Sequence, residues 1–488
     1  MKINFFEKIN IKDKKNINLY LVSEEDIKKS NNQAVKNAVK ILDFTAKYSQ
    51  INLINSGENI AIVVGVGSIK KATIIELQKL GSKIFNFTNS QKFSTVNIFN
   101  EADLQDENIT NIAFGALLQS YRFNNYFVAK KSDKDLKLQS LNFIAENYKT
   151  LEKSFKNLEI IANNVFFTRD LVSQPGNILN PESYADICKN LTKDGLEVNI
   201  LGEKEMQKLG MNSLLAVGVG SARESKLVVI KWNGGGKNKQ PLAFVGKGVT
   251  FDTGGISIKP SANMEDMKTD MAGSAAVVGL LRLLAQRKAK VNVVGVIGLV
   301  ENMPSGTAQR PGDVVKSMSG QTIEVINTDA EGRMVLADAL YYTKTKFNPE
   351  LIVDLATLTG AIIVSLADIY AGIFSNDDNL AKQLISAGDK TSELLWRMPI
   401  GDSYDEMINS DIADMKNVGS GRGAGSTTAA QFLKRFIDDK DAKKQVKWAH
   451  LDIAGVAWKG KGDAFAVKGA TGFGVRLLNQ FIIDNYEK

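Results

Sequence analysis

The sequence predicts an α/β protein, with a smaller N-terminal α/β domain joined by a long helix to a larger C-terminal α/β domain whose sheet is mixed and largely parallel. Three observations lead to this prediction. The 488 residues are 44% hydrophobic and 24% charged, with 8 Pro and one Cys, which is typical of a globular chain. This length corresponds to two or three domains of about 100–200 residues. Strand-like and helix-like segments alternate in the second half, as they do around parallel sheets.

The first clear elements are a buried strand over 59–67 and a helix over 70–80. Gly65 and Gly67 are spaced like the start of a dinucleotide-binding turn, but no third glycine follows at the required distance. We therefore expect these glycines to allow tight packing between the strand and the helix.

A helix-like segment over 139–173 carries leucine and isoleucine at three- and four-residue intervals and ends before Pro175. A long helix that stops at such a break is a reasonable connection between domains. The predicted domains are 1–165, which includes this helix, and 166–488.

Beyond this boundary, strands and helices are expected in alternation. The strands are 227–232, 242–246, 291–299 and 351–355, and the helices are 274–287 and 332–344. In sheets of this kind, ligands lie beyond the carboxyl ends of the strands. We therefore look for chemistry in the segments that follow the strands.

The single histidine, His450, restricts the possible chemistry. It excludes zinc sites built from several histidines and the HExxH helix of metalloproteases. A Ser-His-Asp triad would have to use His450, and the sequence has no GxSxG turn to present the serine. His450 lies in an apolar strand-like run, so we expect a hydrogen-bonded structural histidine. A lone Cys188 cannot form an internal disulfide, which suits a reducing cytoplasm.

Neither a membrane nor a nucleic acid is expected as a partner. The uncharged, apolar-leaning stretch from Leu355 to Ala367 is well short of the roughly 18–20 residues that span a bilayer. The first fifteen residues lack the apolar run of an export signal, so we expect a cytoplasmic protein. The net charge of +7 is small for this length, and no RNP-like segment or zinc finger accompanies it.

A first cluster of chemically interesting residues consists of Lys247, Asp252 and Asp270, which follow a predicted strand in a glycine-rich run. A phosphate-binding loop is excluded, because Gly248 follows Lys247 and Pro241 stands at the first glycine position. By spacing alone, a lysine and two aspartates in a loop are only suggestive, and surface charge is the default explanation.

A second cluster is Asp329, Glu331 and Arg333. If this run is extended, alternate side chains point the same way and the two carboxylates share one space. They repel each other unless a proton or a cation neutralises them. Oxygen ligands suit ions such as Mg²⁺, Mn²⁺ or Zn²⁺. The four carboxylates of the two clusters are enough to hold a pair of divalent ions.

Both clusters lie in segments that resemble the leucyl aminopeptidase (cytosol aminopeptidase) family of two-metal exopeptidases. The resemblance covers about 165–488 strongly. It rests on VGKGVTFDTGGISIKPSANMEDMKTDMAG and NTDAEGRMVLADALYY, supported by RDLVSQPGNILNP, ENMPSGTAQRPGDVV, DLATLTGAI, GRGAGSTTAAQFL and WAHLDIAG. Thr269 and Met334 depart from the pattern without touching a ligand position.

The resemblance implies two divalent ions per chain, Mn²⁺ or Zn²⁺, that share a bridging water or hydroxide. One ion would be held by Lys247, Asp252, Asp270 and Glu331, and the other by Asp252, Asp329 and Glu331. A lysine amine that binds a metal is neutral, so Lys247 is expected to have a lowered pKa. Asp270 would also accept a hydrogen bond from the free α-amine of the substrate.

The resemblance to this family also implies the remaining site residues. Lys259 would stabilise the oxyanion, and Arg333 would hold a bicarbonate ion that acts as general base, unless it simply pairs with a carboxylate. The pocket for the first substrate side chain would favour leucine and other bulky apolar residues. Its wall would consist of Met267, Thr359, Gly360 and Ala361.

The implied protein is a leucyl aminopeptidase of cytosolic peptide turnover, acting on peptides with a free N-terminus and assembled as a homohexamer, a dimer of trimers. Two alternatives stay open: another two-metal hydrolase such as a phosphoesterase, and a DNA-binding or scaffold protein that keeps the fold. The glycine-rich run 419–425 is expected to be a mobile loop near the substrate cleft that leads into a capped helix, with phosphate binding as the alternative.

Overall fold

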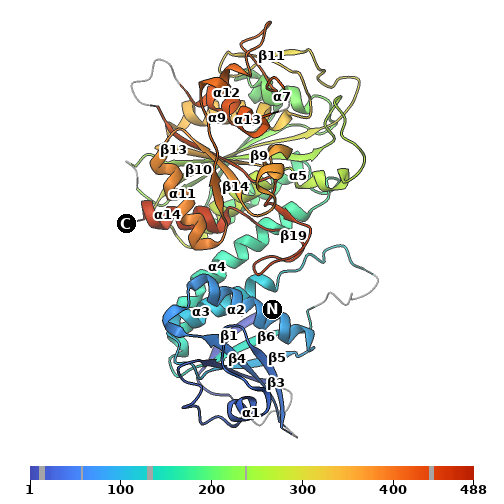
Figure 1. The fold of residues 1–488 in the computed structure, drawn as a ribbon. Coiled ribbons are helices and arrows are strands. Elements are labelled where there is room, and N and C mark those ends of the chain that lie inside the picture. The colour runs from blue at the N-terminus through green and yellow to red at the C-terminus, as the bar shows by residue number, and fades with distance from the viewer. Residues whose placement is uncertain are drawn as a thin grey trace. The chain divides into compact units, whose positions relative to one another are not determined.

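The computed structural model describes residues 1–9, 17–56, 59–128, 136–236, 239–421, 423–438 and 445–487. The chain divides into two compact units (Figure 1). The smaller unit comprises 1–163 and 460–469, and the larger unit comprises 164–459 and 470–488. The helix α4 (Tyr148–Ser173) runs through the boundary between them.

The smaller unit is built on a six-stranded sheet in the order β1-β6-β5-β2-β4-β3, in which only β3 is antiparallel to its neighbour. Its strands are β1 (Lys2–Phe6), β2 (Ile17–Ser23), β3 (Ile51–Ser56), β4 (Asn59–Gly67), β5 (Thr95–Asn100) and β6 (Ser140–Ile144). Its helices are α1 (Gln33–Leu42), η1 (Ile69–Lys71), α2 (Ile74–Ser90) and α3 (Asp106–Gln119). The predicted strand over 59–67 is confirmed as β4.

Two predictions for this unit are wrong. Residues 140–144 form β6 between β1 and β5 instead of the start of a helix, and α4 begins only at Tyr148. Such a short apolar run does not distinguish a buried strand from a helix. A Cβ on Gly65 would lie 2.2 Å from the carbonyl oxygen of Lys47, so this glycine packs against the turn before β3 and not against a helix.

Two glycines let α2 and α3 cross in contact. A Cβ on Gly81 would lie 1.9 Å from the carbonyl oxygen of Ile112, and one on Gly115 would lie 1.8 Å from that of Gln78. We expect Gly115→Ala to lower the free energy of unfolding of this unit by about 3 kcal/mol, because neither backbone can move aside. Inside a helix, a change from glycine to alanine ordinarily raises the free energy of unfolding by about 0.5–1 kcal/mol. A decrease on Gly115→Ala would therefore indicate the close contact between the two helices.

Chemical denaturation of the wild type and the variant measures this effect. Gly306→Ala serves as the control, because a Cβ there meets no atom within 4 Å. If Gly115→Ala is as stable as the wild type, the close crossing of the two helices is wrong.

The larger unit is built on an eight-stranded mixed sheet in the order β15-β14-β17-β13-β9-β10-β8-β7, whose central strands β17, β13, β9 and β10 are parallel. Its strands are β7 (Glu197–Leu201), β8 (Lys226–Asn233), β9 (Leu242–Asp252), β10 (Asn292–Asn302), β13 (Leu351–Ala356), β14 (Ala371–Ser375), β15 (Leu395–Arg397) and β17 (Lys447–Asp452). The same unit contains a small three-stranded sheet in the order β11-β12-β16. Its strands are β11 (Val314–Lys316), β12 (Thr322–Glu324) and β16 (Met415–Lys416). The remaining strands are β18 (Trp458–Lys459) and β19 (Gly469–Ala470).

Helices cover both faces of the large sheet (Figure 1). The first face packs against α5 (Pro181–Asn190), α8 (Ala272–Gln286), α11 (Asp378–Thr391) and α14 (Val475–Tyr486). The second packs against α7 (Asn212–Gly218), α9 (Glu331–Phe347) and α13 (Gly425–Ile437). The other helices are η2 (Leu191–Asp194), α6 (Glu203–Lys208), η3 (Met264–Thr269), α10 (Gly360–Leu366) and α12 (Asp402–Glu406).

This arrangement confirms the predicted α/β class with a mixed, largely parallel sheet. The four predicted strands of the second half are β8, β9, β10 and β13, and the two predicted helices are α8 and α9. Both faces of β9 are buried: Phe244 belongs to the first core and Val245 to the second. None of the helices in the described residues is long and apolar enough to cross a bilayer.

Candidate metal centre

Polar side chains meet where the central parallel strands of the large sheet end. Asp252 is the last residue of β9, Asn302 is the last residue of the adjacent β10, and Thr357 directly follows β13. Asp252 and Asn302 are partners in the register, and the Nδ2 of Asn302 donates to Asp252 Oδ1 over 2.8 Å. The site therefore lies at the carboxyl edge of the sheet, where ligands are expected.

A bulge near the end of β9 aims Asp252 into this site. Val249 pairs with Val300 and Asp252 pairs with Asn302, so β9 carries one residue more than β10 in this interval. Side chains alternate between the faces of a strand, and Lys247 and Asp252 would otherwise point to opposite faces. The extra residue brings the two side chains to the same face. The strand predicted to end near Gly246 is therefore longer, and its end is shaped for the site.

The second cluster reaches the same place by a geometry that we did not expect. Asp329 lies in a turn and Glu331 is the first residue of α9, so the run is not extended. Carboxylate oxygens of Asp252, Asp329 and Glu331 nevertheless lie within 4.8 Å of one another. The predicted convergence is present, but the alternation of an extended strand is the wrong reason for it.

Lys247 connects the two clusters. Its Nζ is 2.7 Å from an oxygen of Asp270 and 2.8 Å from Glu331 Oε1, and it donates to the carbonyl oxygen of Thr357 over 2.9 Å. The side chain is almost completely buried. Burial opposes the charged amine, but the surrounding carboxylates outweigh it and raise the pKa of Lys247. This differs from the lowered pKa that the resemblance implies, so a neutral lysine requires cations that take over the neutralisation of these carboxylates.

Lys259 neutralises the other side of the cluster. Its Nζ lies 2.8 Å from Asp252 Oδ2 and forms an ion pair with Asp329. Burial again opposes the charge, while Asp252 and Asp329 raise the pKa of Lys259. The side chain is one-fifth exposed, so it is more accessible than Lys247.

The carboxylates carry more negative charge than the lysines neutralise. Burial is the main cause that raises the pKa of Asp270, Asp329 and Glu331, and the neighbouring carboxylates, Asp252 among them, add to it. Four carboxylates face two ammonium groups, so full ionisation of the carboxylates would leave an excess of two negative charges. Oxygen donors with an excess of negative charge fit divalent cations, so these residues are suited to hold metal.

Arg333 lies on the first turn of α9 and is buried. Its Nη1 donates to the carbonyl oxygen of Asn417 over 2.7 Å, and its buried Nε has no hydrogen-bond partner. Burial lowers the pKa of Arg333 to about 10, so the side chain stays charged at neutral pH. Among the residues that the structure describes, no carboxylate forms an ion pair with it, so the alternative of a simple ion pair is wrong.

The predicted wall residues lie in two segments. Thr359 is the N-cap of α10, and Gly360 and Ala361 form its first turn. The hydroxyl of Thr359 donates to Asp452 Oδ2 over 2.6 Å, which anchors this segment to the end of β17. Met267 is half-buried in η3, three residues before Asp270.

His450 has the structural place that we expect. It is completely buried on β17, and its Nδ1 lies 2.6 Å from Asp354 Oδ1 on the adjacent β13. Its ring stacks against Phe374. The glycine-rich run leads into α13, but its N-cap Ala424 makes no side-chain cap, so the capped helix is wrong there. Arg422 lies outside the described residues.

The sequence did not indicate the polar residues that hold Asp252, Asp270 and the start of α10 in place. Asn302 fixes Asp252, and the hydroxyl of Thr357 donates to Asp270 Oδ1 over 2.9 Å. Asp452 accepts the N–H of Leu358 over 3.1 Å as well as the hydroxyl of Thr359. Each is a single polar residue at a strand end, and only the pairing of distant strands gives it a role.

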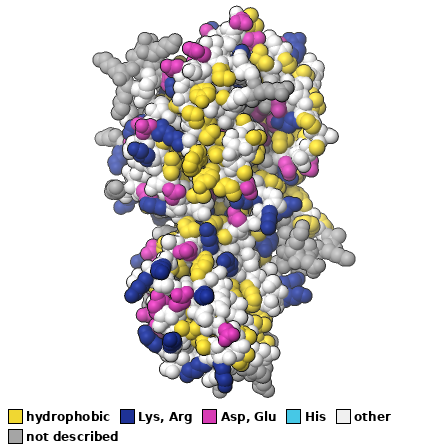
Figure 2. All heavy atoms as spheres, viewed as in Figure 1, with side chains coloured by type: hydrophobic (Ala, Val, Ile, Leu, Met, Phe, Trp, Pro, Cys, Tyr) yellow, Lys and Arg dark blue, Asp and Glu magenta, His cyan; other side chains and the backbone are white. Residues whose placement is uncertain are grey.

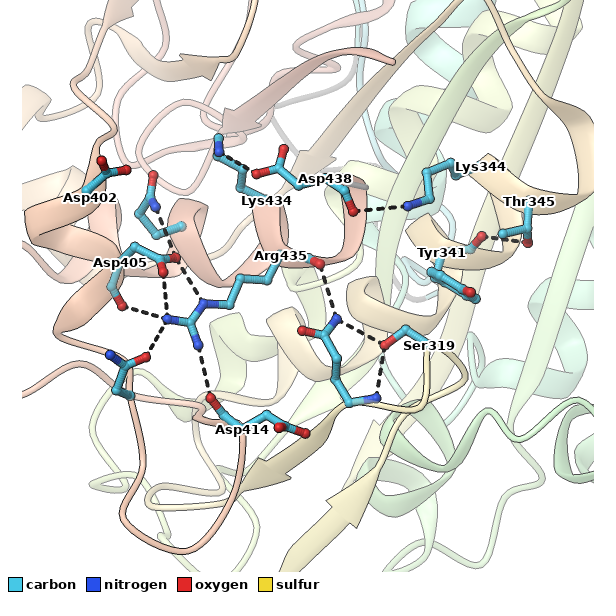
Figure 3. A pocket seen from close by; sticks show the side chains of 13 residues that line it. Ser319, Tyr341, Lys344, Thr345, Asp402, Asp405, Asp414, Lys434, Arg435 and Asp438 are labelled. Atoms are coloured by element: carbon cyan, nitrogen blue, oxygen red, sulfur yellow. Dashed lines mark hydrogen bonds and ion pairs between the residues drawn. The ribbon is translucent and has the colours of Figure 1, made fainter. Parts of the chain in front are cut away.

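A separate cavity of about 780 Å³ lies between α9, α12 and α13 (Figure 3). Its described lining contains none of the predicted site residues. Arg435 forms an ion pair with Asp405 over 2.7 Å, and Lys434 pairs with Asp438. Lys344 donates to the carbonyl oxygen of Ile437. Two of the three cations of this cavity are thus paired with carboxylates of its lining.

Comparisons with known proteins show the same family over both units of the chain. The catalytic domain of the cytosol aminopeptidase family matches residues 166–479, and the N-terminal domain of the same family matches residues 14–130. A probable cytosol aminopeptidase of Rickettsia bellii is 51% identical over 460 residues, which cover 92% of this chain and 90% of the relative. One of Ehrlichia ruminantium is 52% identical over 433 residues, covering 88% and 85%.

A solved structure is similar over nearly the whole chain. It is that of the bottromycin maturation enzyme BotP in complex with Mn, with a TM-score of 0.82 and 30% sequence identity. The match covers 96% of this chain and 98% of that one. The similarity thus includes both units and not only the segment with the carboxylates.

Proposed function

The chain belongs to the cytosol aminopeptidase family of metal-dependent aminopeptidases, and on this premise we propose that it releases leucine and other bulky apolar residues from the N-termini of peptides. The observation that carries the proposal is the convergence of Asp252, Asp329 and Glu331 beside Lys247 and Asp270. The residues that the resemblance requires lie together at one edge of the sheet.

We propose that the site holds two divalent ions, Mn²⁺ or Zn²⁺. Lys247, Asp252, Asp270 and Glu331 would bind one ion, and Asp252, Asp329 and Glu331 the other. The excess of negative charge supports this division, as does the Mn in the solved structure of BotP. When bound, two such ions acidify a water and polarise the peptide carbonyl.

The side chains around the ions have separate tasks in this proposal. Lys259 is charged and partly accessible, so it would stabilise the negative charge that develops on the carbonyl oxygen. Asp270 would accept a hydrogen bond from the α-amine, which explains the need for a free N-terminus. The unpaired Nε of Arg333 supports an anion there, and a bicarbonate ion would supply the general base. Thr359, Gly360, Ala361 and Met267 would border the side-chain pocket.

Hydrolysis of leucine p-nitroanilide tests the proposal. We expect release of the chromophore that is stimulated by Mn²⁺ or Zn²⁺, lost after chelation and restored by adding metal back. N-acetyl-leucine p-nitroanilide should not react, because its amine is blocked. Turnover of the blocked substrate would favour another two-metal hydrolase. So would turnover of phosphate esters without hydrolysis of either anilide.

We also propose that the chain assembles as a homohexamer, as the resemblance implies. We propose a location in the cytoplasm, as the names of the relatives suggest. Hydrophobic side chains gather on one face of the larger unit in Figure 2, and this unit exposes apolar residues such as Val364 and Trp396. Such surfaces are typical of contacts between subunits. Light scattering is expected to give the mass of six chains, and a monomer would contradict the assembly.

A further inference from the structure

We propose that Asn417 is a positioning residue whose side chain holds the turn with Asp329 and the start of α9 in the shape that binds metal. This inference rests on the proposed metal-binding role of Asp329 and Glu331. It concerns a residue outside the predicted ligands, the lysines and the pocket wall.

Asn417 continues a strand pairing beyond the point where the strands end. β16 pairs in parallel with β12, with Met415 opposite Ile323 and Lys416 opposite Glu324. The N–H of Asn417 then donates to the carbonyl oxygen of Glu324 over 3.0 Å. β12 stops at Glu324, and the chain turns toward Asp329.

From there the side chain of Asn417 takes the place of a neighbouring strand. Its Oδ1 accepts the N–H groups of Ile326 over 2.8 Å and Asn327 over 3.3 Å. Its Nδ2 donates to the carbonyl oxygen of Asn327 over 2.7 Å and, more weakly, to that of Ala330 over 3.5 Å. An amide has two donors and two acceptor positions, so all four are engaged with this one segment.

The same residue also fixes the far end of the segment. The carbonyl oxygen of Asn417 accepts the 2.7 Å hydrogen bond from Nη1 of Arg333. One residue therefore contacts the backbone on both sides of Asp329 and the arginine two residues after Glu331. Asn417 is completely buried, so water cannot replace its amide without rearrangement.

Loss of the amide should reshape the turn more than it weakens the core. Alanine at this position leaves the N–H groups of Ile326 and Asn327 without their acceptor, and the carbonyl of Asn327 keeps only the N–H of Ala330 as donor. Aspartate keeps the shape and the accepted bonds, but it places an oxygen against the carbonyls of Asn327 and Ala330. Partners that orient metal ligands typically contribute about 10–100-fold to metal affinity.

The experiment is a calorimetric titration of metal-free full-length protein with Mn²⁺, on the wild type, Asn417→Ala and Asn417→Asp. We expect both variants to bind Mn²⁺ about 10–100-fold more weakly than the wild type. The melting temperature without metal is measured in parallel.

Asn292 provides a matched control in the same unit. Its buried amide also clamps a loop, accepting the N–H of Gly235 and donating to the carbonyls of Gly236 and Lys239. It lies at the amino end of β10, opposite the end that carries Asn302. Asn292→Ala should lower the melting temperature and leave the Mn²⁺ affinity unchanged.

The outcomes separate this inference from the proposed function. Unchanged Mn²⁺ affinity in the Asn417 variants, or an equal loss in Asn292→Ala, overturns the positioning role. A wild type that binds no Mn²⁺ overturns the proposed function itself. If the variants do not fold, hydrogen exchange of the wild type decides: the amides of Ile326 and Asn327 should exchange as slowly as those of β9, and rapid exchange overturns the inference.

Discussion

Replacing Glu331 by glutamine is expected to reduce kcat/KM for leucine p-nitroanilide by roughly 10³-fold, which corresponds to about 4 kcal/mol of lost stabilisation. Glu331 is buried among Asp252, Asp329 and Lys247, and in the proposed division it contacts both ions. Glutamine has the same shape but removes the charge. The titration with Mn²⁺ should show weakened binding together with the loss of activity.

The stability of the variant distinguishes this effect from misfolding. Burial and neighbouring carboxylates raise the pKa of Glu331, so the charged form is unfavourable without metal. Glutamine should therefore leave the melting temperature of the metal-free protein unchanged or raise it. Glu324→Gln is the control. Glu324 lies outside the site, seven residues before Glu331, and its carboxylate accepts the hydroxyl of Ser410. Full activity of Glu331→Gln would refute the assignment.

The sequence was sufficient for the fold class and for the strands β8, β9, β10 and β13 of the larger unit. Long apolar runs such as Val291–Leu299 predict a strand with both faces buried, and β10 has that form. The segment 140–144 failed because its leucine and isoleucine also fit the period of the following helix. The tertiary environment between β1 and β5 decides in favour of the strand, and local pattern does not contain this information.

The sequence predicted which charged residues belong to the site, but not the backbone geometry and hydrogen bonds that position them. The carboxylates and lysines stand out by motif, and the structure brings Asp252, Asp329 and Glu331 together. The bulge of β9 was not predictable, because a bulge is defined by the register with β10. Asn302 and Asn417 were missed for a related reason. A single asparagine at the end of a strand has no period, and its hydrogen bonds become visible only when distant segments are paired.

The second large effect is expected from Gly332→Ala, next to Glu331 on α9. A Cβ at this position would lie 2.6–2.7 Å from Cδ, Cε and Nζ of Lys247. A lysine end is ordinarily flexible, but this one is buried and held by Asp270, Glu331 and the carbonyl of Thr357. The methyl group should displace the ammonium and leave two buried carboxylates without their partner. We expect a loss of about 3 kcal/mol in stability without metal, and at least a tenfold loss in Mn²⁺ affinity and activity.

A double-mutant cycle shows whether the lysine is the cause. Lys247→Ala removes the three atoms that the new methyl group would strike, so adding Gly332→Ala to it should change neither stability nor Mn²⁺ affinity further. Denaturation and calorimetric titration of the four proteins measure both quantities. Additive losses would mean that the methyl group acts on α9 itself. A coupled loss would show that the glycine is needed because Lys247 passes directly over the first turn of this helix.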